Sequence, residues 1–246
     1  MNSLILIVIP PVLLILMMGT LSRVNNSHVV GQELRRKALH ISVGLTALTF
    51  PLFLSEKWMI VASIGLVVAW LLAVRRSAFL RHHFGSVLHG VRRTSLGDVY
   101  FAFAIGGLLL LTQGKPIFFV IPILILTLAD AFAAIVGTMF PVGPLAGVAK
   151  GKTAAGCVAF FVVAFAVSSW LLLAITDLQT ERVLFVAAGV AASTCVAEAI
   201  SRRGVDNLMV PAVAYLALLI SNIPYNAGRL TVVQLQLDLN TLVAGL

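Results

Sequence analysis

The segment PIFFVIPILILTLADAFAAIVGTM, residues 116–139, decides the class of fold. Its one charged side chain is Asp130, and three small residues follow at helical spacing on one face: Ala133, Ala134 and Gly137. A helix needs roughly 20 apolar residues to cross the hydrocarbon core of a bilayer. The segment is therefore predicted to span a membrane, with a face of small residues on which a second helix can pack closely around Asp130.

The remainder of the chain has the same apolar character. Hydrophobic residues make up 60% of the 246 residues and charged residues 11%, whereas a soluble domain carries about 25% charged residues. The mean hydropathy is +1.07. We predict an all-α polytopic membrane protein, a single integral membrane domain over 1–246, with about eight spans near 4–21, 38–55, 58–74, 98–112, 116–139, 153–176, 183–201 and 208–222. The tail, 223–246, is either an interfacial segment or a short strand.

Basic residues are distributed unevenly between alternate loops. Of the 17 Lys and Arg, thirteen fall in one set of loops and four in the other: Lys57, Lys115, Arg182 and Arg229. Because cytoplasmic loops are enriched in bases, we expect the first set in the cytoplasm and both termini on the opposite side, in the inner (plasma) membrane of the cell. The net charge of +8 follows from this topology and does not require nucleic acid as a partner.

Four of the nine acidic residues lie at or within apolar segments: Asp98, Asp130, Glu198 and Asp206. A charged residue at the centre of a bilayer costs roughly 2.5–3.5 kcal/mol on insertion scales. Carboxylate oxygens are suitable ligands for Mg²⁺, which usually takes one or two of them together with substrate phosphates. These four residues are therefore predicted to be the metal ligands.

Two of the four carboxylates also have structural interpretations. Asp98 follows Ser95 at the start of a predicted helix, so the two could form a helix cap. Glu198 could pair with Arg202 one turn further on. No base lies within a turn of Asp130 in the sequence, which makes a functional role strongest there.

Two groups of polar residues are suited to binding phosphate oxygens. Arg36 and Lys37 each lie on a helix face with His40, at the entry to the second span. Positive-inside topology explains the two bases but not His40, which lies a turn into the membrane. Asn207, beside Asp206, adds an amide oxygen as a further ligand.

A third group lies in the Gly-rich segment GVAKGKTAAG, residues 147–156. Lys150 and Lys152 precede a helix expected to open at Thr153, where backbone N–H groups and positive charge can bind an anion. The segment is not a P-loop, because Ala146 stands where the pattern requires glycine and no apolar strand precedes it. The alternative is an ordinary cytoplasmic loop with two lysines.

Taken in order, these motifs resemble those of the polyprenol kinase family, which includes dolichol, phytol and farnesol kinases and a CTP-dependent diacylglycerol kinase. The resemblance lies within residues 35–211. The matching elements are Arg36-Lys37-x-x-His40, Ser95-x-Gly97-Asp98, Ala129-Asp130-x-x-Ala133-x-x-x-Gly137, Lys152-Thr153-x-x-Gly156 and Glu198-x(7)-Asp206-Asn207-Leu208-x-x-Pro211.

The resemblance implies a kinase that transfers the γ-phosphoryl group of CTP, or alternatively ATP, to the hydroxyl of a membrane lipid alcohol in the presence of Mg²⁺. The acceptor would be a polyprenol, phytol, farnesol or a similar isoprenoid. Catalysis would depend on Asp98, Asp130 and Lys152, with Asp130, the deepest carboxylate, accepting the alcohol proton. The nucleotide would be bound by Arg36, Lys37, His40, Lys150, Lys152, Thr153 and Asn207.

Two other functions are weighed against this one. A phosphatidate cytidylyltransferase-like enzyme is less favoured, because the Asp-Arg-x-Asp core of that related family is absent. An ion-coupled transporter would explain acids within the membrane, but it needs access from both sides. On the opposite side, Glu56, Asp177 and Glu181 lie in the loops and not within the spans.

Overall fold

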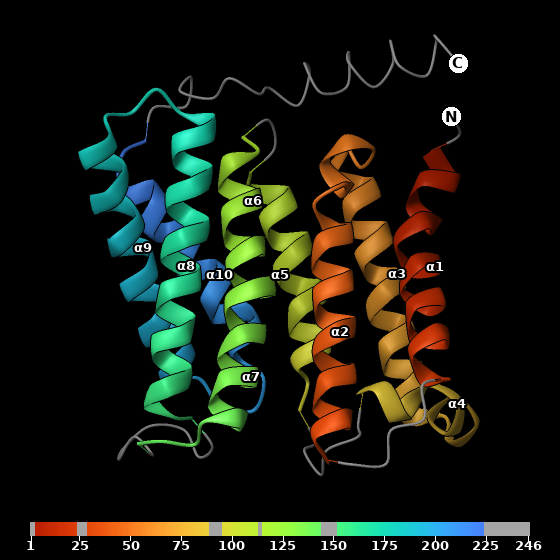
Figure 1. Ribbon diagram of the computed structural model, residues 1–246. Helices are drawn as coiled ribbons and strands as arrows, with labels where there is room; N and C mark the ends of the chain where they lie inside the picture. The colour runs from red at the N-terminus through yellow and green to blue at the C-terminus, as the bar shows by residue number, and fades with distance from the viewer. Residues whose placement is uncertain (1–2, 24–28, 89–94, 113–114, 144–151, 224–246) are drawn as a thin grey trace, which may run out of the picture.

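The computed structural model describes residues 3–23, 29–88, 95–112, 115–143 and 152–223, and regular structure within these ranges is helical, as the apolar runs predict. The helices, drawn in Figure 1, are α1 (Ser3–Ser22), α2 (Val29–Ala47), α3 (Lys57–Arg76), α4 (Ala78–Leu88), α5 (Gly97–Leu111), α6 (Ile117–Leu124), α7 (Asp130–Met139), α8 (Ala154–Ile175), α9 (Thr180–Ile200) and α10 (Asp206–Ile220). A 3₁₀ turn, η1 (Phe50–Leu52), follows α2, and a π-helical turn, η2 (Ile125–Ala129), joins α6 to α7.

Five helical segments in the described ranges are long and apolar enough to cross a membrane: Ser3–Ser22, Lys57–Arg76, Ile117–Met139, Ala154–Ile175 and Thr180–Ile200. Two shorter apolar helices, α5 and α10, accompany them. The chain is therefore an all-α membrane protein. Each of the eight predicted spans contains a helix, although α2 begins at Val29, well before the predicted start at residue 38.

Helix α4 was not predicted. The sequence between the third and fourth spans suggested a basic loop, but residues 78–88 form a helix. Its apolar side packs on the bundle, where the rings of Phe84 and Trp70 meet edge to face at 5.5 Å. His82 and His83 are exposed.

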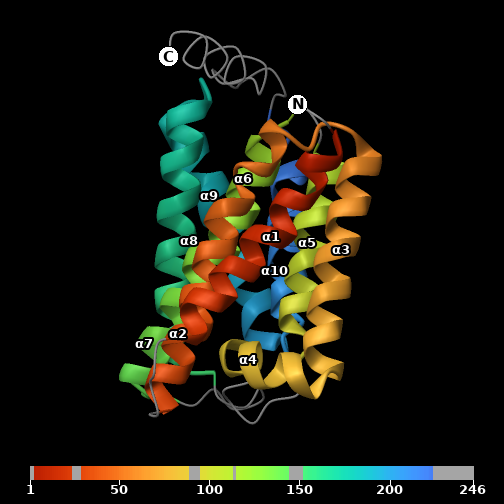
Figure 2. The same ribbon diagram turned by 90° about the vertical axis from the view of Figure 1, so that its right-hand side faces the viewer.

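The helices form a bundle in which α1 and α3 lie at one flank and α8 and α9 at the other, with α5, α6, α7 and α10 between them (Figure 1). Helices α5, α8 and α10 begin, and α7 and α9 end, at the lower end of this view. Helix α4 lies at the same end (Figure 2). The polar motifs lie at these helix ends, so they come together at one end of the bundle.

The π-helical turn positions the deepest acid. It widens the helix immediately before Asp130, and such turns leave carbonyl groups without their usual helical partners. Gly44 of α2 lies directly against this turn, since a Cβ at that position would come within 2.7 Å of Thr127 Cγ2. Because Gly44 has no side chain, α2 can approach this turn closely, and Lys37 and His40 come near Asp130.

The predicted face of small residues is confirmed. A Cβ placed on Gly156 of α8 would lie 3.0 Å from the carbonyl oxygen of Ala133 and 3.6 Å from Cα of Gly137. Helix α8 therefore packs backbone to backbone on α7. This contact places the start of α8, with Lys152 and Thr153, beside the end of the helix that carries Asp130.

Candidate functional site

Asp130 has a buried partner that the local sequence does not reveal. Lys37 Nζ lies 2.5 Å from Asp130 Oδ2 and donates a second hydrogen bond, 3.2 Å long, to the carbonyl oxygen of Asp130. The two side chains are only 3% and 9% exposed. The partner comes from α2, 93 residues earlier in the chain. Two buried opposite charges in contact satisfy each other, so the electrostatic cost of Asp130 is offset by Lys37.

His40 completes this first cluster. Its Nε2 lies 3.1 Å from the carbonyl oxygen of Leu126, within the π-helical turn, and 3.6 Å from Asp130 Oδ2. A carbonyl oxygen only accepts hydrogen bonds, so Nε2 carries the proton. The imidazole ring also stacks on Phe101 of α5, with 4.3 Å between the ring centroids. His40 therefore connects α2, the π turn and α5.

Lys152 forms the centre of a second cluster. Its ammonium group donates to Glu198 Oε1 and lies 3.5 Å from Asp206 Oδ2, at the end of α9 and the start of α10. Burial alone would lower the pKa of the Lys152 ammonium, but the charges of Glu198 and Asp206 raise it above its ordinary value. Lys152 is therefore charged at neutral pH. It also interacts electrostatically with Asp130, which makes the two clusters neighbours.

Thr153 begins α8 as predicted. Its side-chain oxygen accepts a hydrogen bond from Gly156 N at 3.1 Å, so it is the N-cap of the helix. The backbone N–H groups of this first turn point toward the end of the bundle where Lys152 lies, an arrangement that favours anions.

A third ion pair joins α3 to α5. Arg75 Nη2 donates to Asp98 Oδ1 and, at 2.7 Å, to the carbonyl oxygen of Ser95. The other carboxylate oxygen, Asp98 Oδ2, is buried and accepts no hydrogen bond from the described parts of the chain. Leu96, not Ser95 or Asp98, is the cap residue of α5, and it has no side-chain cap. Ser95 Oγ does accept a 3.2 Å hydrogen bond from Gly97 N, and Asp98 lies in the first turn, but the Asp98 side chain binds Arg75. The predicted cap formed by Ser95 and Asp98 together is therefore wrong.

The pairing suggested between Glu198 and Arg202 is also wrong. Glu198 is buried and its partner is Lys152, whereas Arg202 is exposed. The reason is geometric: α9 ends at Ile200, so Arg202 does not continue the helix face on which Glu198 lies.

Asn207 connects the α9–α10 turn to the start of α5. Its Nδ2 donates a 2.7 Å hydrogen bond to the carbonyl oxygen of Gly97, and the side chain is buried. Ser95 Oγ donates to the carbonyl oxygen of Arg203 at 2.9 Å across the same contact. Two segments 110 residues apart in the sequence are thus fixed against each other, with Asp98 on one and Asp206 on the other.

Gly204 makes this contact possible. It adopts φ of +85°, and a Cβ there would lie 2.7 Å from Cα of Gly97 and closer still to Ser95 Oγ. Gly204→Ala is expected to lower the free energy of unfolding by more than the roughly 1–2 kcal/mol of left-handed backbone strain, since the added carbon also separates the two segments. Thermal unfolding in detergent measures the loss.

Gly189→Ala is the matched control. Gly189 lies within α9, and nothing is found within 4 Å of a Cβ at that position. It should be neutral or slightly stabilising, because alanine favours a helix. Equal melting temperatures for Gly204→Ala and wild type would contradict the close contact.

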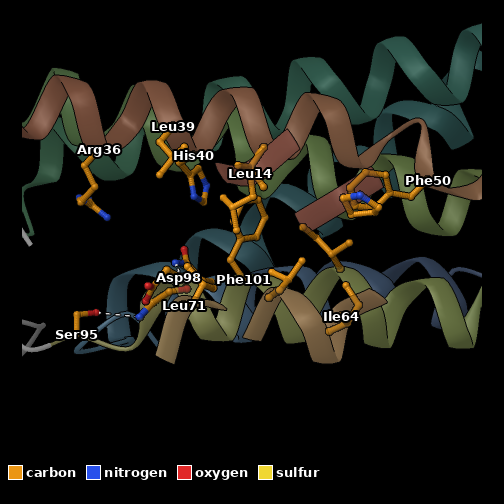
Figure 3. A pocket seen from close by; sticks show the side chains of 17 residues that line it. Leu14, Arg36, Leu39, His40, Phe50, Ile64, Leu71, Ser95, Asp98 and Phe101 are labelled. Carbon is orange, nitrogen blue, oxygen red and sulfur yellow. Dashed lines mark hydrogen bonds between the residues drawn. The ribbon is translucent and has the colours of Figure 1, made fainter. Parts of the chain in front are cut away.

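A cavity of about 120 Å³ opens among α1, α2, α3 and α5. Its polar lining residues are Arg36, His40, Ser95, Asp98 and Asn207, and the remainder of the lining is apolar apart from the backbone of Gly97. Figure 3 shows Arg36 and Asp98 toward one end of the cavity and Phe50 and Ile64 at the other. An elongated apolar space with a single polar end suits an amphipathic molecule.

The residues fit a divalent cation only in part. No group of three or more His, Cys, Asp and Glu side chains comes close enough to hold a metal within the described ranges. The four carboxylates predicted as one ligand set are instead paired with three different cations, Lys37, Arg75 and Lys152. Glu198 and Asp206 do converge on one ammonium group, and two carboxylates with substrate phosphates and water are a common Mg²⁺ environment.

Most predicted site residues lie at this end of the bundle, in three adjoining groups: Lys37, His40 and Asp130; Lys152, Thr153, Glu198 and Asp206; and Arg36, Asp98 and Asn207. Lys150 lies outside the described residues. The sequence did not indicate Arg75 as a site residue, because a base at the end of a span is already explained by the enrichment of bases in cytoplasmic loops.

Comparison with models of known protein families, with curated proteins and with solved structures found no match to this chain.

Proposed function

We propose that the protein is a kinase that phosphorylates the hydroxyl of a membrane lipid alcohol. The observation that carries the proposal is the junction between the cavity and the charged end of the bundle. Asn207 lines the cavity, and its neighbour Asp206 lies against Lys152. A lipid in the cavity would therefore present its hydroxyl close to a site suited to polyphosphate.

Asp98 is the residue best suited to accept the alcohol proton. It lines the cavity, and its Oδ2 is a buried acceptor without a partner in the described structure. Arg75 binds the other oxygen and stabilises the ionised form. Asp130 was the expected base, but it does not line the cavity, whereas Asp98 does, so we assign this step to Asp98.

The phosphates would lie beside Lys152 and the first turn of α8. In phosphoryl transfer the protein acts mainly by positioning the two substrates and stabilising negative charge on the transferred group. Lys152 is charged, and the α8 N-terminus adds backbone donors. As the hydroxyl oxygen bonds to the γ-phosphorus, its proton passes to Asp98 Oδ2 and the nucleoside diphosphate leaves.

Glu198 and Asp206, with the amide of Asn207, would hold Mg²⁺. The ion, when bound, neutralises phosphate charge and orients the phosphates. CTP as the donor, with ATP as the alternative, rests on the resemblance to polyprenol kinases. The distribution of bases supports a cytoplasmic position for this end of the bundle, in the inner (plasma) membrane.

Incubation of the purified full-length protein with γ-labelled CTP, Mg²⁺ and a panel of lipid alcohols tests the proposal. We expect a labelled lipid phosphate and CDP. Lys152→Met should lower kcat about 10²–10³-fold, the effect of removing one pre-organised charge-stabilising donor. Lys57→Met is the matched control, because Lys57 is an exposed lysine at the start of α3, at the opposite end of the bundle.

Other products would contradict the proposal. Release of pyrophosphate with phosphatidate as acceptor would indicate cytidylyl transfer. Solute uptake by proteoliposomes without any phosphorylated lipid would indicate a transporter.

A further inference from the structure

The far end of the cavity is lined by apolar side chains. The apolar lining comes mainly from α1, α2, α3 and α5. Leu71 lies near Asp98, and Phe50 and Ile64 lie at the opposite end (Figure 3). A chain that enters with its hydroxyl at Asp98 therefore points toward these two residues.

Neither of these two side chains has space behind it into which it could move. Ile64 lies against the backbone of α5, since a Cβ on Gly106 would be 2.8 Å from Ile64 Cγ1. Phe50 is 5% exposed and meets the ring of Phe53 edge to face at 5.8 Å. A longer chain would have to displace side chains that are packed from behind, and such displacement is costly in a well-packed interior.

We infer that Phe50 and Ile64 determine the chain length of the alcohol that the site accepts, because they lie at the end of the cavity opposite Asp98. The inference rests on the proposed function only in assuming that the hydroxyl is phosphorylated; selection by chain length can be measured without that step. Phe50 and Ile64 are specificity residues, because they would contact the distal part of the substrate and none of the reacting atoms.

Binding and transfer should be measured separately with saturated primary alcohols of eight to twenty carbons. Binding of each radiolabelled alcohol to the full-length protein in nanodiscs is measured without nucleotide, and transfer is measured with CTP and Mg²⁺. Wild type should show a cut-off, with affinity falling at least about tenfold within two or three carbons beyond the optimum. Ile64→Ala and Phe50→Leu should each move the cut-off to longer chains.

Ile64→Phe should move the cut-off to shorter chains, because Gly106 leaves no space behind it. Ile60→Ala is the matched control: Ile60 is a buried isoleucine one turn earlier on α3 that does not line the cavity. It should leave the length profile unchanged although it also removes core volume.

The outcomes separate the two proposals. A length profile that is identical in wild type and all three cavity variants overturns the inference, even if the protein is a kinase. A cut-off in binding that moves with the variants supports the inference, even if no alcohol is phosphorylated.

Discussion

Asp98→Asn is expected to abolish phosphorylation of the lipid alcohol while the protein keeps its fold. The amide retains the shape of the side chain and can still accept the hydrogen bond from Arg75 through Oδ1. It cannot accept the proton of the attacking hydroxyl. Loss of a positioned general base costs about 10²–10⁴-fold in rate, so kcat should fall by that factor with little change in KM for the alcohol.

The control is Glu181→Gln. Glu181 lies exposed in the first turn of α9, at the other end of the bundle, and loses the same charge in the same way. Its kcat should equal that of wild type. A kcat above one tenth of wild type in Asp98→Asn would show that the acceptor of the proton is another group, and Asp130 would then be the next candidate.

The sequence predicted the fold well for a simple physical reason. Apolar runs of spanning length must form helices, because a bilayer offers no partners for unpaired backbone groups. Residues 116–139 therefore read directly as one transmembrane segment. Helix α4 was not predicted, because its short amphipathic pattern between Arg75 and Arg92 resembles a basic loop. Its packing on the bundle through Phe84 is seen only in the structure.

The sequence predicted which residues form the site, but not which residues they contact. Intramembrane acids are conspicuous on energetic grounds, so Asp130 and Glu198 stood out. Their partners depend on contacts between helices, which local spacing does not report. Lys37 reaches Asp130 because Gly44 lets α2 approach the π-helical turn, and no feature near Asp130 in the sequence indicates this.

The Lys37–Asp130 pair should have the largest effect on stability. Removing one member of a buried ion pair leaves the other charge unpaired in an apolar surrounding, which costs about 3–5 kcal/mol. Lys37→Met and Asp130→Asn should each lower the free energy of unfolding by that amount, measured by denaturant titration in mixed micelles. Asp130→Asn should also abolish transfer, although the protein still inserts into the membrane.

The double variant Lys37→Met/Asp130→Leu separates the structural from the functional contribution of the pair. It removes both charges together, and replacing a buried pair by apolar side chains is often neutral or stabilising, so stability should return close to that of wild type. Activity should not return, because in the proposed reaction Lys37 would supply positive charge to the phosphates, and Asp130 interacts electrostatically with Lys152. A stable double variant with wild-type kcat would mean that the pair only holds α2 against α7, and that the reaction depends on Asp98 and the Lys152 cluster alone.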